Sequence, residues 1–404
     1  MLYCSTVLSS SLGAGIRSAG RGSRAPPEAV CMVHNAQLTS AGDKSGTGQF
    51  CIMASVEHGG VPLGVKLPAI ILASFLSMFF AEVFSGSSPL WFFSGWGLLV
   101  TLPLYGGHLL LLINLAMRFR RTSVSSLYLW GILFGLYESW ITKVLWAGYI
   151  GATPGLGTFF GIGVQEFAVL ALFWHPVFSF IIPVLVYETL VAAAGNPGGV
   201  LPSHAPFLAR RRQNFILAGA ALLIGASFLN VGVQTNAPGA VVTILGSVAL
   251  ISLALWLAVR ERRGEAAQFG IGSLRLGRRG FSVLVIYIAV LYAVTFPLLL
   301  PERIPGLPVI AFTLAIYGAV VALIYLKKPN GEAASPPANG TTFFSIRDLG
   351  GLAIALVAAT AILSLSPVAD FVLFYGFYWG ITGAGCFLLA MVMVMILRER
   401  LRAR

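Results

Sequence analysis

The sequence predicts an all-α, polytopic integral membrane protein with about ten transmembrane helices plus one re-entrant or broken segment. Hydrophobic residues make up 57% of the 404-residue chain and charged residues only 10%, whereas a soluble domain carries about 25% charged residues. Several apolar runs follow one another, and most reach the length of about 18 residues that a helix needs to cross a bilayer. Because a chain in lipid must satisfy its own backbone hydrogen bonds, we expect these runs to be helices.

Eleven hydrophobic runs can be placed along the chain. They are 66–84, 90–116, 127–150, 158–174, 176–194, 214–234, 239–259, 281–300, 308–326, 349–366 and 371–397. Residues 1–62, rich in Ser and Gly, are expected to be a disordered tail or the result of a start codon assigned too early. The remainder divides into a membrane domain with polar intramembrane residues, 63–212, and a six-helix membrane domain of three hairpins, 213–404.

The basic residues predict the orientation of the chain. They gather in alternate loops, at 118–121, 210–212, 260–279, 327–347 and 398–404, and Arg303 is the exception in the loops between. Since basic residues accumulate on the cytoplasmic side of short loops, we expect a multi-pass protein of the cell membrane with both termini cytoplasmic. The net charge of +12 is therefore a topology signal, and the expected partner is the lipid bilayer, with no nucleic acid.

The charge pattern conflicts with three full crossings between Arg121 and Arg210. Both arginines are expected on the same side, so an even number of crossings must separate them, yet three apolar runs do. His175-Pro176 divides the stretch 158–194 into two short runs, and proline suits the first turn of a new helix. We therefore predict that a re-entrant or broken helix pair lies here, in contact with protein or a water-filled cavity.

Polar residues inside the predicted membrane region concentrate beside this irregular segment. They are Glu138, Lys143, Gln165, Glu166, His175 and Glu188. Ionisable residues in a bilayer are costly and often functional. Glu82 and Asp370 are expected at the interface, and His108 is a minor candidate, usually explained as a hydrogen-bonded structural residue.

Glu138, His175 and Glu166 are the predicted catalytic residues, because a carboxylate in apolar surroundings can act as a general base and a histidine can share its proton. Lys143, Glu188 and Gln165 are the predicted binding residues. The structural alternatives are that Lys143 extends to the outer interface and that Glu188 and Gln165 hydrogen-bond neighbouring helices. No metal or cofactor is predicted, since no short ligand spacing such as HExxH is present.

Two short segments carry a family resemblance. Glu138-Ser139-Trp140-Ile141-Thr142-Lys143 resembles the EExxxR motif, and Phe173-Trp174-His175-Pro176 resembles the later histidine motif, of the CAAX protease and bacteriocin-processing family of intramembrane proteases. The resemblance implies that Glu138 activates a water that attacks a peptide bond and that His175 assists.

This sequence departs from the family pattern at four positions. Ser139 replaces the second glutamate, Lys143 replaces the arginine, and Ala171 replaces a phenylalanine. The family's last motif is absent, since His204 is not followed by the expected Asn or Asp.

Three functional hypotheses follow from these observations. The first is an intramembrane hydrolase-like enzyme, acting on a small-molecule or peptide substrate within the membrane. The second is a secondary transporter whose midplane carboxylates bind a proton or cation. The third is a membrane scaffold in which the charges serve only helix packing. The confinement of the charges to the first half of the chain favours a localised site and hence the first hypothesis.

Overall fold

Nine helices in the described part of the chain are long and apolar enough to cross a membrane. The computed structural model describes residues 63–196, 199–232, 237–261, 269–330 and 342–402, all within one compact unit. The all-α, polytopic membrane class is confirmed. The tail predicted at 1–62 lies outside the described residues.

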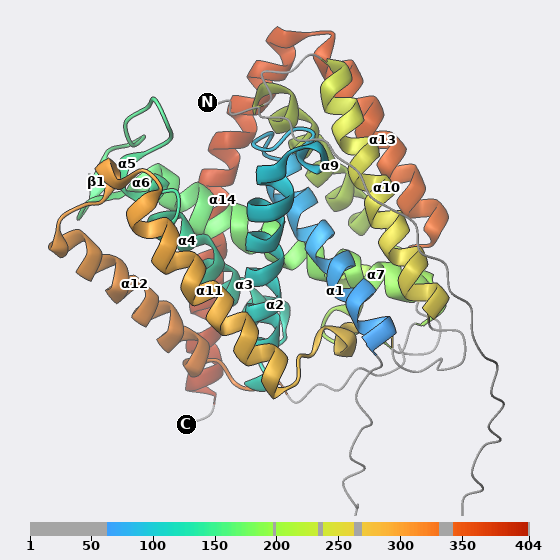
Figure 1. Cartoon of the computed structure of the whole chain (residues 1–404), viewed down its shortest axis with the longest axis horizontal. Helices are drawn as coiled ribbons and strands as arrows, with labels where there is room; N and C mark the ends of the chain where they lie inside the picture. Colours follow the sequence, from blue (N-terminus) through green and yellow to red (C-terminus); the bar gives the residue numbers. More distant parts are fainter. Residues whose placement is uncertain (1–62, 197–198, 233–236, 262–268, 331–341, 403–404) are drawn as a thin grey trace, which may run out of the picture. The chain divides into compact units, whose positions relative to one another are not determined.

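Helices make up most of the described chain (Figure 1). The first half contains α1 (Leu63–Met78) continued by the π-helical η1 (Phe79–Val83), η2 (Trp91–Phe93), η3 (Gly97–Thr101) leading into α2 (Leu102–Arg118), then α3 (Val124–Gly135), α4 (Tyr137–Trp140) and α5 (Val144–Ala147). A two-residue hairpin, β1 (Thr158–Phe159) and β2 (Ile162–Gly163), precedes α6 (Val164–Glu166), η4 (Phe167–Ile181) and α7 (Ile182–Ala193). The second half contains α8 (Ala205–Leu208), α9 (Arg212–Gly232), α10 (Ala237–Glu261), η6 (Ile271–Leu274), α11 (Arg278–Leu298), η7 (Pro301–Arg303), α12 (Leu307–Leu326), α13 (Ile346–Ser364) and α14 (Pro367–Leu401).

Burial separates central helices from peripheral ones. In the continuous helix Val164–Ala193, 67% of the membrane-length window is buried, whereas in α11 none is. Helix α3 packs along η4, and two glycines of α3 permit the close approach. A Cβ on Gly131 would lie 2.4 Å from Pro176 Cα, and one on Gly135 would lie 2.8 Å from Ala171 Cα. Small residues four apart are a common means of close packing between membrane helices.

The predicted break at His175-Pro176 is wrong. Residues 164–193 form one continuous helix, whose central part, η4, is π-helical with Pro176 inside it. Proline lacks an amide, and in a π-helix that amide would pair with the carbonyl five residues earlier, Ala171 O. The Tyr128 hydroxyl on α3 donates to the next carbonyl, Leu172 O, at 2.8 Å. A side chain from another helix therefore supports the turn before the proline, where the helix continues. The three apolar runs thus become the interrupted segment 124–147 and one long helix, and of these two only the long helix is by itself a candidate membrane span.

The broken segment lies one element earlier, in the run 127–150. After α3 the chain forms only the short helices α4 and α5, with Lys143 between them in the left-handed conformation at φ +57°. Lys143 is fully buried. Its ammonium donates to Thr295 O at 3.1 Å and to Leu299 O, near the end of α11. The alternative in which this side chain extends to the outer interface is therefore not the arrangement observed.

Arg303, in the loop after α11, makes the reverse connection. Its guanidinium donates to Ala147 O at 3.2 Å and to Gly148 O at 2.7 Å, where α5 ends. Each cation satisfies carbonyls at the end of the other's neighbouring helix, which is where positive charge is favourable. The broken segment and the α11–α12 hairpin are thus tied together by two sets of charge-assisted hydrogen bonds.

Candidate functional site

The six predicted site residues occupy four separate places. Glu138 and His175 lie together, Lys143 binds the end of α11, Gln165 and Glu166 lie at the start of a long helix, and Glu188 pairs with a residue not predicted for the site.

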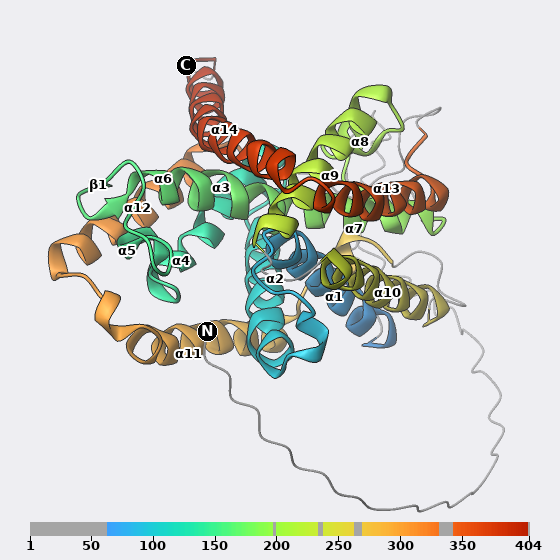
Figure 2. The same ribbon diagram turned by 90° about the horizontal axis from the view of Figure 1, so that it is seen from above.

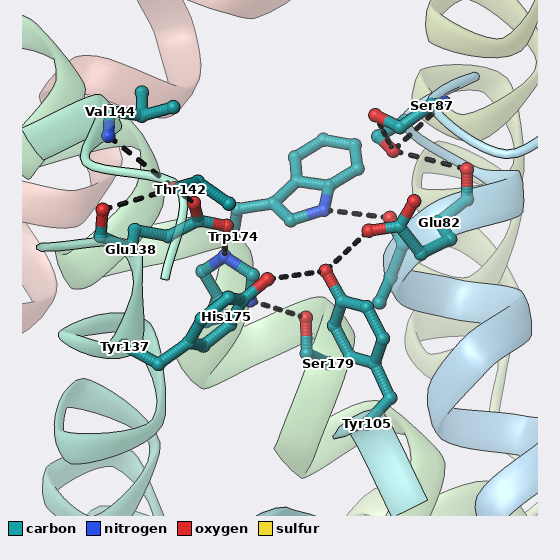
Figure 3. Close-up of polar contacts among 12 residues, drawn as sticks. Glu82, Ser87, Tyr105, Tyr137, Glu138, Thr142, Val144, Trp174, His175 and Ser179 are labelled. Atoms are coloured by element: carbon teal, nitrogen blue, oxygen red, sulfur yellow. Dashed lines mark hydrogen bonds and ion pairs between the residues drawn. The ribbon is translucent and has the colours of Figure 1, made fainter. Parts of the chain in front are cut away.

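Glu138 and His175 form a direct hydrogen-bonded pair (Figure 3). His175 Nε2 lies 3.0 Å from Glu138 Oε1. Glu138 comes from α4, in the broken segment, and His175 from η4, and they are only 7% and 2% exposed. Because a buried carboxylate is unfavourable without a partner, this contact explains how Glu138 can be held inside the protein.

Each member of the pair also contacts a hydroxyl group that lies four positions later in the chain. The Thr142 hydroxyl donates to Glu138 Oε2, and Ser179 Oγ lies 2.9 Å from His175 Nδ1. Positions four apart lie on the same side of a helix, so the local sequence places each hydroxyl next to its partner. Both Glu138 oxygens and both His175 ring nitrogens are thereby occupied, which fixes the orientation of the carboxylate and of the imidazole.

Aromatic rings surround the imidazole of His175. Phe134 stacks on it with ring centroids 5.6 Å apart, and Tyr137 meets it edge-on at 5.0 Å. On the other side of Phe134 lies His108, whose Nδ1 is 2.8 Å from Leu104 O and whose Nε2 is 3.0 Å from the Tyr292 hydroxyl. Since the carbonyl can only accept, Nδ1 carries the proton and Nε2 accepts from Tyr292. These bonds match the structural explanation given for His108.

A chain of hydroxyl groups leads from this pair to a third carboxylate. The Tyr137 hydroxyl, which interacts electrostatically with Glu138, lies 2.6 Å from the Tyr105 hydroxyl. Tyr105 donates to Glu82 Oε1 at 2.5 Å, and Ser88 donates to Glu82 Oε2 at 2.6 Å. Figure 3 shows Tyr105 between His175 and Glu82. The sequence predicts an interfacial Glu82 but not its hydrogen bond to Tyr105, because no residue spacing in the sequence indicates that contact.

Glu166 does not join the pair. It lies nine residues before His175 on the same helix, which corresponds to about 13 Å of α-helical rise. Its Oε1 accepts a hydrogen bond from the Gly155 amide at 2.9 Å, and its Oε2 is buried without a hydrogen-bond partner among the described residues. Gln165 lies beside it and packs against Gly155. These two residues hold the loop before α6.

Glu188 forms a second buried carboxylate–imidazole pair, with His204. Its Oε2 lies 2.5 Å from His204 Nδ1, and its Oε1 accepts from the Leu201 amide at 2.9 Å. The other ring nitrogen, Nε2, lies 2.8 Å from Thr122 O. Glu188 is 13 residues beyond His175, roughly three turns along the helix, so the two pairs are distinct. His204 lies in a Gly/Pro loop, and no spacing in the sequence indicates a buried partner for Glu188 there.

Over the part of the chain that the structure describes, no three His, Cys, Asp or Glu side chains come together as a set of metal ligands.

Comparison with other proteins places the chain among membrane proteins. Residues 71–402 match an uncharacterized membrane protein family. The chain belongs to this family. An uncharacterized protein from Archaeoglobus fulgidus is 39% identical over 156 residues, which are 38% of this chain and 47% of the archaeal protein. The match thus spans about half the length of that relative, and no solved structure matches. The resemblance to CAAX proteases rests on the two short motifs.

Proposed function

We propose that this multi-pass membrane protein is an intramembrane hydrolase in which Glu138 and His175 are the acid–base pair. The observation that supports it best is the 3.0 Å hydrogen bond between the two side chains, each nearly excluded from solvent. We further propose, from the alternating basic loops, that both termini lie on the cytoplasmic side of the cell membrane.

The proposed step is general-base hydrolysis. A water bound beside Glu138 loses a proton to the carboxylate while its oxygen attacks a carbonyl carbon. The proton then passes to the leaving group as the carbon–leaving-group bond breaks, so the carboxylate is regenerated. His175 orients Glu138 and stabilises its ionised form. Thr142 and His175 each contact one carboxylate oxygen, and each oxygen can accept a second hydrogen bond, so a water can bind Glu138 beside either of them.

The nearby phenols supply a second requirement of the reaction. A carbonyl under attack develops negative charge on oxygen, and fixed hydrogen-bond donors stabilise that charge. Tyr137 is adjacent to Glu138 in the chain, and since Tyr105 donates to Glu82, the Tyr137 hydroxyl donates to Tyr105 in the resting state. It can serve as such a donor by turning from Tyr105 to the substrate. We assign these hydroxyls, rather than Glu166, as the additional polar groups of the site.

Proton-coupled transport is the second candidate, and the hydroxyl chain favours it. Tyr137 and Tyr105 connect the region of Glu138 to Glu82, and a discontinuous membrane helix beside a buried carboxylate is typical of transporter sites. In this alternative Glu138 binds and releases a proton with no covalent step.

Reconstituted protein distinguishes the two candidates. Proteoliposomes are incubated in water enriched in heavy oxygen, with a pool of membrane-spanning peptides or with phospholipid esters, and the products are analysed by mass spectrometry. A hydrolase incorporates one labelled oxygen into a carboxylate product. Because acid–base groups contribute about 100-fold to 10,000-fold, Glu138→Gln and His175→Gln should each lower the rate by at least about 100-fold.

Glu166→Gln is the matched control, because it also removes a buried carboxylate, and we expect it to keep most of the activity. A product free of label in the parent protein, together with acidification of the vesicle lumen that depends on Glu138, would replace hydrolysis by transport. Parent-like behaviour of both Glu138→Gln and His175→Gln in both assays would leave only a packing role for the pair.

A further inference from the structure

The structure contains an apolar cavity that is lined by residues other than Glu138 and His175. Its volume is about 430 Å³, and residues of α1, η1, α7, α8, α9, α10 and α13 line it. These helices gather on one side of the bundle in Figure 2. Phe207 and Leu217, which line it, are 46% and 63% exposed, so it opens to the surroundings as a groove. We call it the α9 groove.

The α9 groove has the length of one bilayer leaflet. On α13 its lining runs from Ile346 to Leu356 and on α9 from Asn214 to Leu222, which correspond to about 15 Å and about 12 Å of helix. The hydrocarbon core of a bilayer is about 30 Å thick, so the groove covers about half of it. Since α9 and α13 both begin at the same end of the groove, that end lies at the level of the lipid headgroups.

Arginines surround this end of the groove. Arg211 and Arg212 lie three and two residues before the groove residue Asn214, Arg347 follows the groove residue Ile346, and all three are exposed. Arg210 ties the two chain segments together, because its amide donates to Thr342 O at 2.7 Å. Its side chain is paired with Asp348 at 3.1 Å. With Asp348 engaged in this way, the mouth carries an excess of positive charge from four arginines and one aspartate.

We propose that the α9 groove binds an anionic phospholipid, with one acyl chain in the groove and the phosphate at Arg211, Arg212 and Arg347. An apolar channel of leaflet length fits an acyl chain, and basic pockets between membrane helices attract anionic headgroups. Guanidinium groups also match the geometry of phosphate oxygens. This inference rests on observations other than those behind the proposed hydrolase, so either can fail alone.

The Glu188–His204 pair supports one wall of the α9 groove. Helix α8 begins directly after His204, and its residues Phe207 and Leu208 line the groove. Since His204 is held by Glu188 Oε2 and by Thr122 O, the buried pair fixes α8 against α7. One wall of the groove is thereby held in place.

Native mass spectrometry of the full chain in mild detergent tests the proposal. The protein is titrated with phosphatidylglycerol and, separately, with phosphatidylcholine of the same chains. We expect tighter binding of phosphatidylglycerol. Each basic residue near a membrane surface contributes enough free energy for about a 5-fold change in affinity. Arg211→Gln with Arg212→Gln should therefore reduce the affinity for phosphatidylglycerol by about 25-fold. The affinity for phosphatidylcholine, whose choline group offsets its phosphate charge, should fall by less, so the preference is reduced.

The matched control removes two arginines from another helix start. Arg278 and Arg279 are exposed in the first turn of α11 and line no part of the groove, so their double glutamine variant should keep the preference. Ala221→Trp, which fills the groove, should lower binding of both lipids, with a melting temperature near that of the parent confirming the fold. An equal loss of preference in both double variants would overturn the proposal, as would parent-like lipid binding in a folded Ala221→Trp protein or tighter binding of phosphatidylcholine.

Discussion

Replacing Tyr128 by phenylalanine removes a hydroxyl that the structure places at the weak point of the central helix. This hydroxyl donates to Leu172 O at 2.8 Å and lies 3.2 Å from Gly385 O, and Tyr128 is 3% exposed. The carbonyl of Leu172 lies in the turn before Pro176, next to the Ala171 carbonyl for which the proline has no amide. In the variant the Leu172 carbonyl loses its side-chain donor.

The expected loss of stability is about 1–2 kcal/mol. A buried polar group that loses its partner costs about 1–3 kcal/mol, whereas hydrogen bonds between membrane helices average about 0.6 kcal/mol with a maximum near 1.7. The free energy of unfolding is measured by titrating detergent-solubilised protein with a denaturing detergent. Tyr375→Phe is the control, because Tyr375 is 47% exposed and makes ring contacts only.

A double-mutant cycle tests the reason for this loss. Pro176→Ala supplies the amide that proline lacks, so Tyr128→Phe should cost less in that background. We expect a coupling energy of at least about 0.5 kcal/mol, the range found for residues that share a hydrogen-bond network. If Tyr128→Phe costs the same with proline and with alanine at position 176, the hydroxyl does not compensate for the proline and the explanation of the continuous helix is wrong.

Two further predictions concern the broken segment and the helix that it crosses. Lys143→Met should lower the free energy of unfolding by about 1–3 kcal/mol, because it leaves buried carbonyls at the end of α11 without donors. The control Lys328→Met, at an exposed position, should change the free energy of unfolding by less than about 0.5 kcal/mol. Equal effects of the two substitutions would refute the capping role of Lys143. Gly131→Ala should cost about 1–3 kcal/mol through overpacking, because its Cβ would meet the backbone of Pro176 at 2.4 Å. Gly318→Ala, whose Cβ meets nothing within 4 Å, should be neutral or stabilising, and a similar loss in both would show that α3 can move away from η4.

The membrane class and the Glu138–His175 pairing could be predicted from the sequence because each depends on local information. Composition and run length determine the class, and the two motifs place a carboxylate and an imidazole on consecutive membrane segments. The break could not be placed in this way. Pro176 carries the stronger local signal for a helix end, but Tyr128 from another helix donates a hydrogen bond to the turn before the proline. The interruption instead falls near Lys143, where long-range bonds to α11 support it.

The partners of Glu82 and Glu188 were missed for a similar reason. Tyr105 lies 23 residues after Glu82, and His204 lies 16 residues after Glu188 in a loop rather than a helix. Neither spacing corresponds to one face of a helix, so the periodicity of the sequence contains no information about the pairing. Only the packing of separate segments brings these groups together.

The reciprocal bonds of Lys143 and Arg303 have a consequence for mutational scanning. Helix α11 has none of its membrane-length window buried, so its attachment depends heavily on such polar connections. Lys143 of the broken segment donates to α11, and Arg303 of the hairpin donates to the end of α5. Substituting either residue alone therefore leaves the hydrogen bonds of the other intact. A scan of single substitutions would therefore understate how strongly the connected end of the α11–α12 hairpin is attached. The joint variant should lose more stability than the sum of the two single losses.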